Sequence, residues 1–321
     1  MILRTFQDLR LSPSVVSAID ELNFSEPTPI QQKAIPLLKA GCDVIGQAQT
    51  GTGKTAAFGI PLAERISENN DTQALILTPT RELALQVANE LKKITKYRNV
   101  HIEAIFGGQP IVPQMKALNR GVQVVVGTPG RILDHIKRKT LVTAKVEMVV
   151  IDEADEMLDM GFIQDIELIL KQMPAKRQTM LFSATLQNDI KRLAKRYMDD
   201  PTTVSVTRGN ETASTVDQVF YRTFEAHKLE ALTRIIESKH IEVAIVFCRT
   251  KKGVSTLAKS LNEKGYKAEE LHGDLTQPQR LQVMKAFREK RVRLLIATDI
   301  AARGIDVAHV THVVNYDIPE D

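Results

Sequence analysis

The stretch Gly41–Phe58, GCDVIGQAQTGTGKTAAF, joins a short apolar run to a glycine-rich turn and then to a helical pattern. The turn meets the motif GxxxxGK[ST] except at its first glycine, which is Ala48 in this chain. An alanine needs only ordinary backbone angles at the entrance to such a loop. A plain strand-to-helix turn is the alternative interpretation. The strand before the turn and the helix after it favour a nucleotide phosphate site.

The residue types in this turn suit a phosphate group. Gly51 and Gly53 allow backbone N–H groups to point inward at phosphate oxygens. Lys54 supplies a mobile ammonium group, and the Thr55 hydroxyl can ligate Mg²⁺ at the start of the helix. We therefore expect ATP-type phosphates and Mg²⁺ at this position.

Length and composition indicate an ordinary globular protein. The 321 residues are enough for about two domains, each with its own core. Hydrophobic residues make up 43% of the chain and charged residues 26%, which argues against disorder, collagen or a coiled coil. The net charge of +4 permits a polyanionic partner without requiring one.

Cysteine and histidine usage indicates a cytoplasmic protein without a metal cluster. Cys42 and Cys248 lie in separate halves in apolar settings, so we expect two buried thiols and no disulfide. The N-terminus does not look like a secretory signal, and no apolar run approaches the roughly 18 residues of a membrane span. His309 and His312 form a close pair without the additional ligands that zinc requires.

Apolar runs of four to six residues, each followed by a helical pattern, come after the glycine-rich turn. They are ALILT, VQVVVG, MVVID and TMLFSAT. Continuous apolar strands that alternate with helices predict an α/β fold, with a parallel sheet covered on both faces. Ligands in such folds bind at the carboxyl ends of the strands, where the polar residues of these segments fall.

The second half of the chain repeats this pattern. ALILTPTRE starts at Ala74 and AIVFCRTKK at Ala244, an offset of 170 residues that also brings Thr128 onto Thr298. The shared spacing favours two related α/β domains over coincidence. Residues 203–217 are rich in Thr, Ser, Gly and Asn, as an exposed connector would be. We expect an N-terminal domain over 1–205, a linker over 206–216 and a C-terminal domain over 217–321.

Two adjacent carboxylates follow the run MVVI. Asp152 can hold Mg²⁺ through water opposite Thr55, and Glu153 can orient or deprotonate the attacking water. An acidic helix start is the alternative, because carboxylates favour helix N-termini. The glycine-rich turn about a hundred residues earlier favours the catalytic interpretation. Since the second half lacks the GK pair, one nucleotide is expected, where the two domains face each other.

Asp152-Glu153-Ala154-Asp155 resembles the signature of the DEAD-box ATP-dependent RNA helicases of helicase superfamily 2. The resemblance covers nearly the whole chain, and each further motif follows in the family's order: PTPIQ (27–31), AQTGTGKT (48–55), PTREL (79–83), the Gly107-Gly108 pair, TPGR (128–131), SAT (183–185), VFCRT (246–250), HGD (272–274) and TDIAARGID (298–306). The family's own phosphate turn begins with alanine, which accounts for Ala48.

The resemblance implies two tandem RecA-like domains, with ATP and Mg²⁺ as cofactors and RNA as the partner. Its nucleotide-binding residues would be Phe24, Gln31, Ala48, Gln49, Thr50, Gly51, Thr52, Gly53, Lys54, Thr55 and Asp306. Phe24 would stack on the adenine and Gln31 hydrogen-bond to it. Its catalytic residues would be Lys54, Asp152, Glu153, Ser183, Thr185 and Arg303. Ser183 and Thr185 would link the ATP and RNA states, bridging the catalytic strand to the acidic site in the closed form only.

The family's RNA contacts map onto both halves. They would be Pro79, Thr80, Arg81, Gly108, Thr128, Gly130, Arg131, Arg249, Thr250, Gly273, Gln277, Arg280 and Thr298. Arg, Thr and backbone N–H groups suit a phosphate grip without sequence preference, and contacts to 2′-hydroxyls would favour RNA over DNA. With no Trp and 5% aromatic residues, base reading by stacking is not expected. Ribonucleoprotein components are a further partner class that the resemblance allows, and no residue indicates an oligomeric state.

The chain ends at VVNYDIPED, before the histidine- and arginine-rich motif with which the family continues. We therefore expect a truncated second domain and slow hydrolysis, because the missing arginines would stabilise the transferred phosphoryl group. The expected function is ATP-driven local unwinding of short RNA duplexes by domain closure. A nucleotide-gated RNA clamp with little turnover is the alternative. A DNA translocase of the same superfamily is disfavoured by the PTREL, DEAD and SAT motifs.

Overall fold

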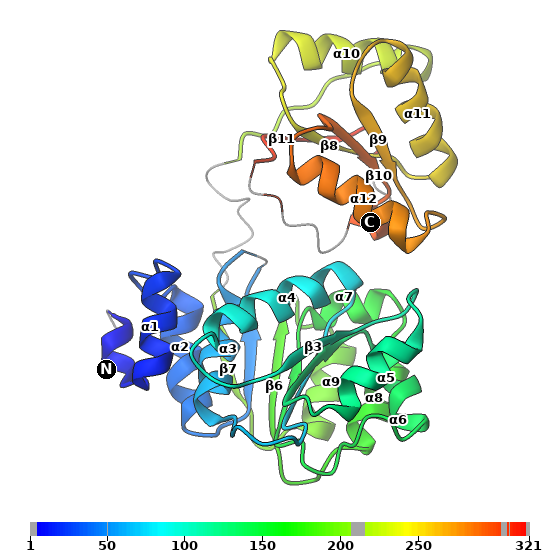
Figure 1. The fold of residues 1–321 in the computed structure, drawn as a ribbon. Coiled ribbons are helices and arrows are strands. Elements are labelled where there is room, and N and C mark those ends of the chain that lie inside the picture. Colours follow the sequence, from blue (N-terminus) through cyan, green and yellow to red (C-terminus); the bar gives the residue numbers. More distant parts are fainter. Residues whose placement is uncertain (1–4, 50, 207–215, 303–306, 308, 319–321) are drawn as a thin grey trace. The chain divides into compact units, whose positions relative to one another are not determined.

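The computed structural model describes residues 5–49, 51–206, 216–302, 307 and 309–318. It divides into two compact units, Met1–Glu211 and Thr212–Asp321, and each unit is an independent α/β body (Figure 1). The predicted linker, 206–216, lies almost entirely outside the described residues. No helix in the described ranges is long and apolar enough to span a bilayer.

The first unit is built on a seven-stranded sheet in the order β3-β4-β2-β5-β6-β1-β7, in which every pairing is parallel. The parallel sheet confirms the prediction from the apolar runs. Its strands are β1 (Val44–Gln47), β2 (Ala74–Leu77), β3 (Ile102–Ile105), β4 (Val124–Gly127), β5 (Met148–Ile151), β6 (Gln178–Ser183) and β7 (Thr202–Ser205).

Helices cover both faces of this sheet (Figure 1). They are η1 (Phe6–Leu9), α1 (Pro13–Glu21), α2 (Pro29–Lys39), α3 (Lys54–Arg65), α4 (Arg81–Ile94), α5 (Ile111–Asn119), α6 (Pro129–Lys137), α7 (Ala154–Asp159), α8 (Ile163–Lys171) and α9 (Asn188–Tyr197). Strand residues alternate between two apolar cores: Ile76 packs in a cluster with residues of α2, α3 and α4, and Leu75 in a cluster with residues of α6, α8 and α9. Two-sided burial explains why the strands β2, β4 and β5 are apolar at every position.

The second unit contains a four-stranded parallel sheet in the order β11-β8-β10-β9. Its strands are β8 (Ala244–Phe247), β9 (Ala268–Leu271), β10 (Leu294–Ala297) and β11 (His312–Asn315), and its helices are η2 (Glu225–His227), α10 (Lys228–Ser238), α11 (Lys251–Glu263), α12 (Gln277–Arg288) and α13 (Asp299–Ala302). Val246 and Ile245 face two different apolar clusters, so this sheet is also covered on both sides.

The spatial order of the strands supports the predicted duplication. β3-β4-β2-β5 in the first unit corresponds to β9-β10-β8-β11 in the second, in the same sequential roles. β2 and β8 begin at Ala74 and Ala244, 170 residues apart, and β4 and β10 begin with the same offset. Two sheets therefore share a connectivity as well as a spacing, which coincidence between apolar runs would not produce.

The prediction of two buried thiols is wrong for one of them. Cys248 is 2% exposed, and burial raises the pKa of its thiol to about 12. Cys42 is exposed. It lies in the turn that follows Gly41, and the strand begins only at Val44, two residues later than the apolar character of the stretch suggests.

Candidate active site and nucleic-acid surface

The glycine-rich turn connects β1 to α3 and has the backbone that a phosphate cradle requires. Gly51 and Gly53 have φ of 75° and 88°, in the left-handed region that favours glycine. Gly53 is also the N-cap of α3, and a side chain there would collide with the amide group of Gln31. Ala48 is fully buried and donates its N–H to the Ser183 carbonyl at 3.0 Å, which explains why a small side chain is tolerated at this entrance.

β5 delivers the two carboxylates to the same edge of the sheet. Lys54 Nζ lies 3.9 Å from Asp152 Oδ1, and both side chains are almost completely buried. Burial raises the pKa of Asp152, and the ammonium group of Lys54 opposes this shift. The pKa of Glu153 is raised to about 7, first by burial and then by the charge of Asp152. Glu153 has φ of 53°, a strained conformation of a kind that occurs often at functional sites.

The donor set fits ATP with Mg²⁺. Thr55, the second residue of α3, offers a hydroxyl, and Asp152 offers a carboxylate at the end of β5, which β6 separates from β1 in the sheet. No group of three or more His, Cys, Asp or Glu side chains with metal-binding geometry occurs among the described residues. Mg²⁺ usually takes one or two protein oxygens and keeps phosphate and water as its remaining ligands, and Thr55 and Asp152 offer such oxygens.

The segment that contains Gln31 supports the turn from the side. The Gln31 amide donates to the Gly53 carbonyl at 3.1 Å, and the Thr28 hydroxyl donates to the Thr52 carbonyl at 2.8 Å. The Gln31 side-chain oxygen accepts the Thr28 N–H at 2.9 Å as part of a capping box at the start of α2. Gln31 thus contacts the turn directly, while the ring of Phe24 stacks on Phe6 with centroids 6.1 Å apart.

The SAT segment bonds to the last residue of the DEAD sequence. Asp155 Oδ2 accepts the N–H groups of Ala184 and Thr185 at 3.0 and 2.8 Å and the Thr185 hydroxyl at 3.1 Å. Ser183 donates its hydroxyl to the Thr185 carbonyl at 2.6 Å. The bridge between this strand and the acidic site therefore forms within the first unit alone. The expectation that the bridge depends on the closed state stays a prediction.

The RNA contacts predicted in the first unit converge at one edge. They follow β2, β3 and β4, which are neighbours in the sheet and parallel, so their carboxyl ends lie together. The Arg81 guanidinium packs on Gly108, where a side chain would overlap it. Arg131 donates to the Gln109 carbonyl from Nη1 and Nη2 at 3.2 and 3.1 Å. The remaining residues at this edge are Pro79, Thr80, Thr128 and Gly130.

The second unit repeats this convergence. Arg249 and Thr250 follow β8, Gly273 lies just beyond β9, and Thr298 directly follows β10, three strands that are also neighbours. Thr250 caps α11 by accepting the Gly253 N–H at 3.0 Å, as Thr80 caps α4 by accepting the Leu83 N–H at 3.2 Å.

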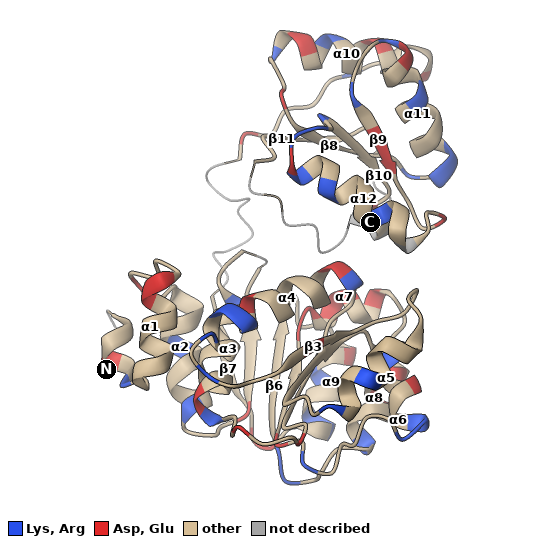
Figure 2. Cartoon of the chain, in the orientation of Figure 1, with Lys and Arg blue, Asp and Glu red and all other residues tan. Residues whose placement is uncertain are grey.

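Three predicted residues, Thr50, Arg303 and Asp306, lie outside the described residues. The backbone of Gln277 begins α12, but its side chain is not described. Arg280, on the same helix, donates to the Ala301 carbonyl at 3.1 Å. Basic and acidic residues are interspersed on the helices of both units (Figure 2).

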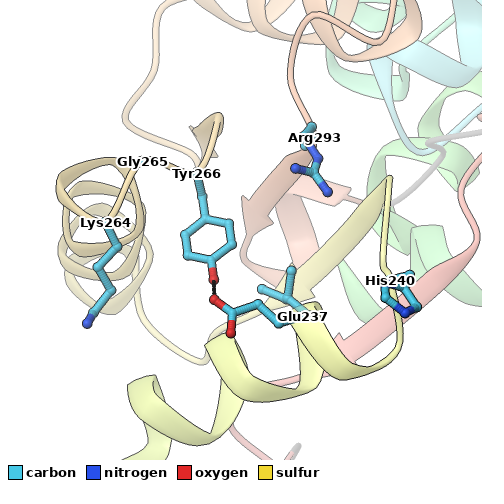
Figure 3. A pocket seen from close by; sticks show the side chains of 7 residues that line it. Glu237, His240, Lys264, Gly265, Tyr266 and Arg293 are labelled. Atoms are coloured by element: carbon cyan, nitrogen blue, oxygen red, sulfur yellow. Dashed lines mark hydrogen bonds between the residues drawn. The ribbon is translucent and has the colours of Figure 1, made fainter.

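A hollow of about 450 Å³ in the second unit is lined by none of the RNA residues predicted in that unit. Figure 3 shows Tyr266 and Glu237 facing each other across it, joined by a hydrogen bond of 2.8 Å. Tyr266 and Arg293 precede β9 and β10, so the hollow opens at the amino ends of the strands. The predicted nucleotide and RNA residues lie at the opposite, carboxyl ends.

Sequence reasoning missed three polar residues that organise the site. Asp155 anchors the SAT segment, Thr28 holds the glycine-rich turn, and Gln114 contacts Arg131. Asp155 and Thr28 lie inside motifs that were recognised, so their position was a usable signal. The signal for Gln114 was weaker, because the sequence shows only a glutamine between apolar residues of a short helix.

Comparisons with known proteins agree with this geometry. The profile of the DEAD/DEAH box helicase family matches residues 28–193, and that of the helicase conserved C-terminal domain matches residues 227–321. The DEAD-box ATP-dependent RNA helicase CshA of Geobacillus kaustophilus is 52% identical over 99% of this chain and 68% of that protein. The ATP-dependent RNA helicase CshA of Listeria monocytogenes is 50% identical over 98% of this chain and 61% of that protein.

Solved structures lead to the same family. A DEAD box protein from Methanococcus jannaschii is 45% identical, with a TM-score of 0.63 over 99% of this chain and 86% of that one. Dbp5 of Saccharomyces cerevisiae bound to RNA and ADP BeF3 is 33% identical, with a TM-score of 0.88 over 98% of this chain and 81% of that one. The chain spans about three fifths to two thirds of the length of the two CshA proteins. With both profiles matched and half of its residues shared with such relatives, the chain belongs to the DEAD/DEAH box helicase family.

Proposed function

We propose that this chain is the core of an ATP-dependent RNA helicase that binds the RNA backbone and locally separates short duplexes. The observation that carries the proposal is the buried Lys54–Asp152 pair beside Glu153, at the edge of the sheet where the predicted RNA residues also gather. The relatives named as RNA helicases, and a neighbour solved with RNA and ADP BeF3, support it.

Each residue of the nucleotide site has a proposed role. The N–H groups of the glycine-rich turn and Lys54 bind the phosphates, Gln31 and Phe24 bind the base, and Glu153 orients the attacking water. Thr55 and Asp152 would hold Mg²⁺, which neutralises phosphate charge when it is bound. From the second unit, we propose Asp306 at the ribose and Arg303 near the phosphates.

RNA binding is proposed for the strand ends of both units. Arg81, Arg131, Arg249 and Arg280 offer charged donors to phosphates, and Thr hydroxyls and glycine N–H groups offer neutral ones. Such contacts carry no sequence information but distinguish RNA through its 2′-hydroxyls. We further propose that domains 1–205 and 217–321 close on ATP and RNA together, and that the protein acts in the cytoplasm.

Steady-state ATP hydrolysis with and without single-stranded RNA tests the proposal. We expect RNA to stimulate hydrolysis by the wild-type chain, and Glu153→Gln to abolish the stimulated rate while nucleotide binding persists. Comparison of single-turnover with steady-state hydrolysis separates a helicase from a nucleotide-gated clamp, because a clamp would complete one turnover and then stall. Hydrolysis that is indifferent to both RNA and Glu153→Gln would refute the proposed acidic site.

A further inference from the structure

Helix α5 (Ile111–Asn119) is anchored to the protein by an amide side chain. Gln114 is the one residue of this helix that is buried, at 4% exposure, whereas Val112 is 55% exposed. A surface helix normally buries an apolar stripe, and a buried polar group is costly unless its hydrogen bonds are made. The position of Gln114 therefore calls for partners that use its amide group.

The contacts of Gln114 join three segments. Its Nε2 donates to the Phe106 carbonyl at 3.0 Å, next to the Gly107–Gly108 turn on which Arg81 packs. Its Oε1 accepts a hydrogen bond from Arg131 Nη1 at 3.0 Å. Because the Phe106 carbonyl can only accept, the amide orientation is fixed, and Oε1 must face Arg131. A single side chain thus ties Arg131 to the turn that seats Arg81.

His135 contacts the same oxygen. Its side chain is fully buried, with Nε2 3.2 Å from Gln114 Oε1 and Nδ1 2.8 Å from the Thr140 hydroxyl. Since Gln114 Oε1 has no proton, the His135 Nε2 atom must carry one and donate it. Both lone pairs of the amide oxygen are then used, one by His135 and one by Arg131, and the amide cannot rotate without breaking both bonds.

Arg131 is therefore held before any ligand arrives. Nη1 is shared between Gln114 and the Gln109 carbonyl, and Nη2 also donates to Gln109. A guanidinium group that is already fixed loses less conformational freedom when it binds a phosphate than a flexible one does. Fixing it from a buried amide, and not from a carboxylate, leaves its positive charge uncompensated by this contact.

We propose that Gln114, supported by His135, is a positioning residue that presents Arg131 to the RNA backbone. The inference rests on the proposed RNA-binding function. It differs from a purely structural role for Gln114 in one respect: loss of Gln114 should weaken RNA binding through Arg131 and by no other route.

A double-mutant cycle tests that route. Affinity would be measured by fluorescence anisotropy of a labelled single-stranded oligouridylate, with the full chain and a non-hydrolysable ATP analogue. We expect Gln114→Met, which keeps the volume and removes the amide, to weaken binding by about fivefold. In an Arg131→Ala background the same change should alter affinity by less than about twofold, because coupled residues are not additive.

Two further variants separate positioning from stability. Ile166→Val, in the buried core of the same unit, should lower Tm while RNA affinity stays within about twofold of wild type. Val112→Gln, on the exposed face of α5, is the matched control and should change neither. If Gln114→Met does not fold, His135→Phe replaces it in the cycle, because it removes the support from Oε1 and keeps a ring in the core.

The outcomes distinguish failure of the positioning role of Gln114 from failure of the proposed helicase function. Equal weakening by Gln114→Met with and without Arg131 would overturn the positioning role, as would an affinity loss in Ile166→Val as large as that in Gln114→Met. If Arg131→Ala binds RNA as tightly as wild type, this inference falls and the helicase proposal stands. If the wild-type chain binds no RNA, the proposed function itself fails.

Discussion

The guanidinium group of Arg81 occupies the space into which a side chain at Gly108 would project. Nη1 and Nη2 of Arg81 both lie within contact of that position, and Gly108 has φ of 78°. At the preceding Gly107 the nearest Arg81 atom is 3.9 Å from the corresponding position, an ordinary van der Waals distance, and φ is not positive. Gly108 thus requires both a left-handed backbone and free space for Arg81, whereas Gly107 requires neither.

Gly108→Ala should therefore lower both stability and RNA affinity, whereas Gly107→Ala should change neither. We expect Gly108→Ala to destabilise the first unit by about 1–2 kcal/mol through its left-handed backbone, and to weaken RNA binding by displacing Arg81. Urea unfolding and RNA anisotropy measure the two effects, with Gly107→Ala as the matched control. Equal behaviour of the two variants would show that the seat of Arg81 is unimportant.

Glu153→Gln should lower RNA-stimulated ATP hydrolysis by about 10²–10⁴-fold, because a neutral amide cannot accept the proton of the attacking water. Nucleotide affinity should stay close to wild type, since the phosphate cradle and the Lys54–Asp152 pair are intact. Asp159→Asn, an exposed carboxylate at the end of the same helix, is the control. A comparable loss in Asp159→Asn would point to helix α7 as a whole and away from a chemical role of Glu153.

The fold was predictable because its signal is local and repeated. The strands β2, β4, β5, β8 and β10 are continuous apolar runs, and each is followed by a helix, so sequence order alone specifies a parallel sheet and places the polar residues at one edge. Cys42 shows the limit of such reasoning, because apolar character does not locate the first residue of a strand.

The contacts that organise the site were less accessible to prediction. Asp155 and Thr185 are 30 residues apart, and Gln114 and Arg131 are 17 apart on different helices. Nothing in either segment alone specifies its partner. A motif identifies which residues are needed at a site, whereas the hydrogen bonds that hold them depend on how separate loops meet at the sheet edge.

Thr185→Val should weaken the bridge between the SAT segment and the acidic site. The variant keeps the backbone N–H donated to Asp155 and removes the hydroxyl bond of 3.1 Å, so we expect a loss of about 1 kcal/mol in the unfolding free energy of the first unit. Thr185→Ser, which keeps a hydroxyl, should recover most of it. Identical unfolding of the valine and serine variants would show that the hydroxyl bond contributes nothing measurable.

Thr80 and Thr250 cap equivalent helices in the two units, so their removal should have equivalent effects. We expect Thr80→Ala and Thr250→Ala each to cost about 1 kcal/mol, in the first and the second unit respectively, and the serine variants to restore it. Differential scanning calorimetry assigns each loss to a transition. A Thr250→Ala effect confined to the transition of the first unit would contradict the independence of the two units.

His135 should make the stability of the first unit depend on pH. Its pKa is lowered by burial and then by the Arg131 charge, with Arg138 acting in the same direction and Asp134 opposing it. The folded state therefore binds the proton less readily than the unfolded state, in which a histidine titrates near about 6.5.

Above about pH 6.5 this histidine is neutral in both the folded and the unfolded state, and the unfolding free energy has its full value. As pH falls towards the lowered pKa of the folded state, the unfolded state takes up a proton that the folded state does not, so the unfolding free energy decreases. Between pH 7.5 and 5.5 the wild type should lose more unfolding free energy than His135→Phe, by about 1 kcal/mol, since one pKa unit corresponds to about 1.4 kcal/mol. Urea unfolding at the two pH values measures this, with His101→Asn at an exposed position as the control. Parallel losses in wild type and His135→Phe would mean that His135 accepts its proton without unfolding, and that the network with Gln114 and Thr140 tolerates a charged imidazole.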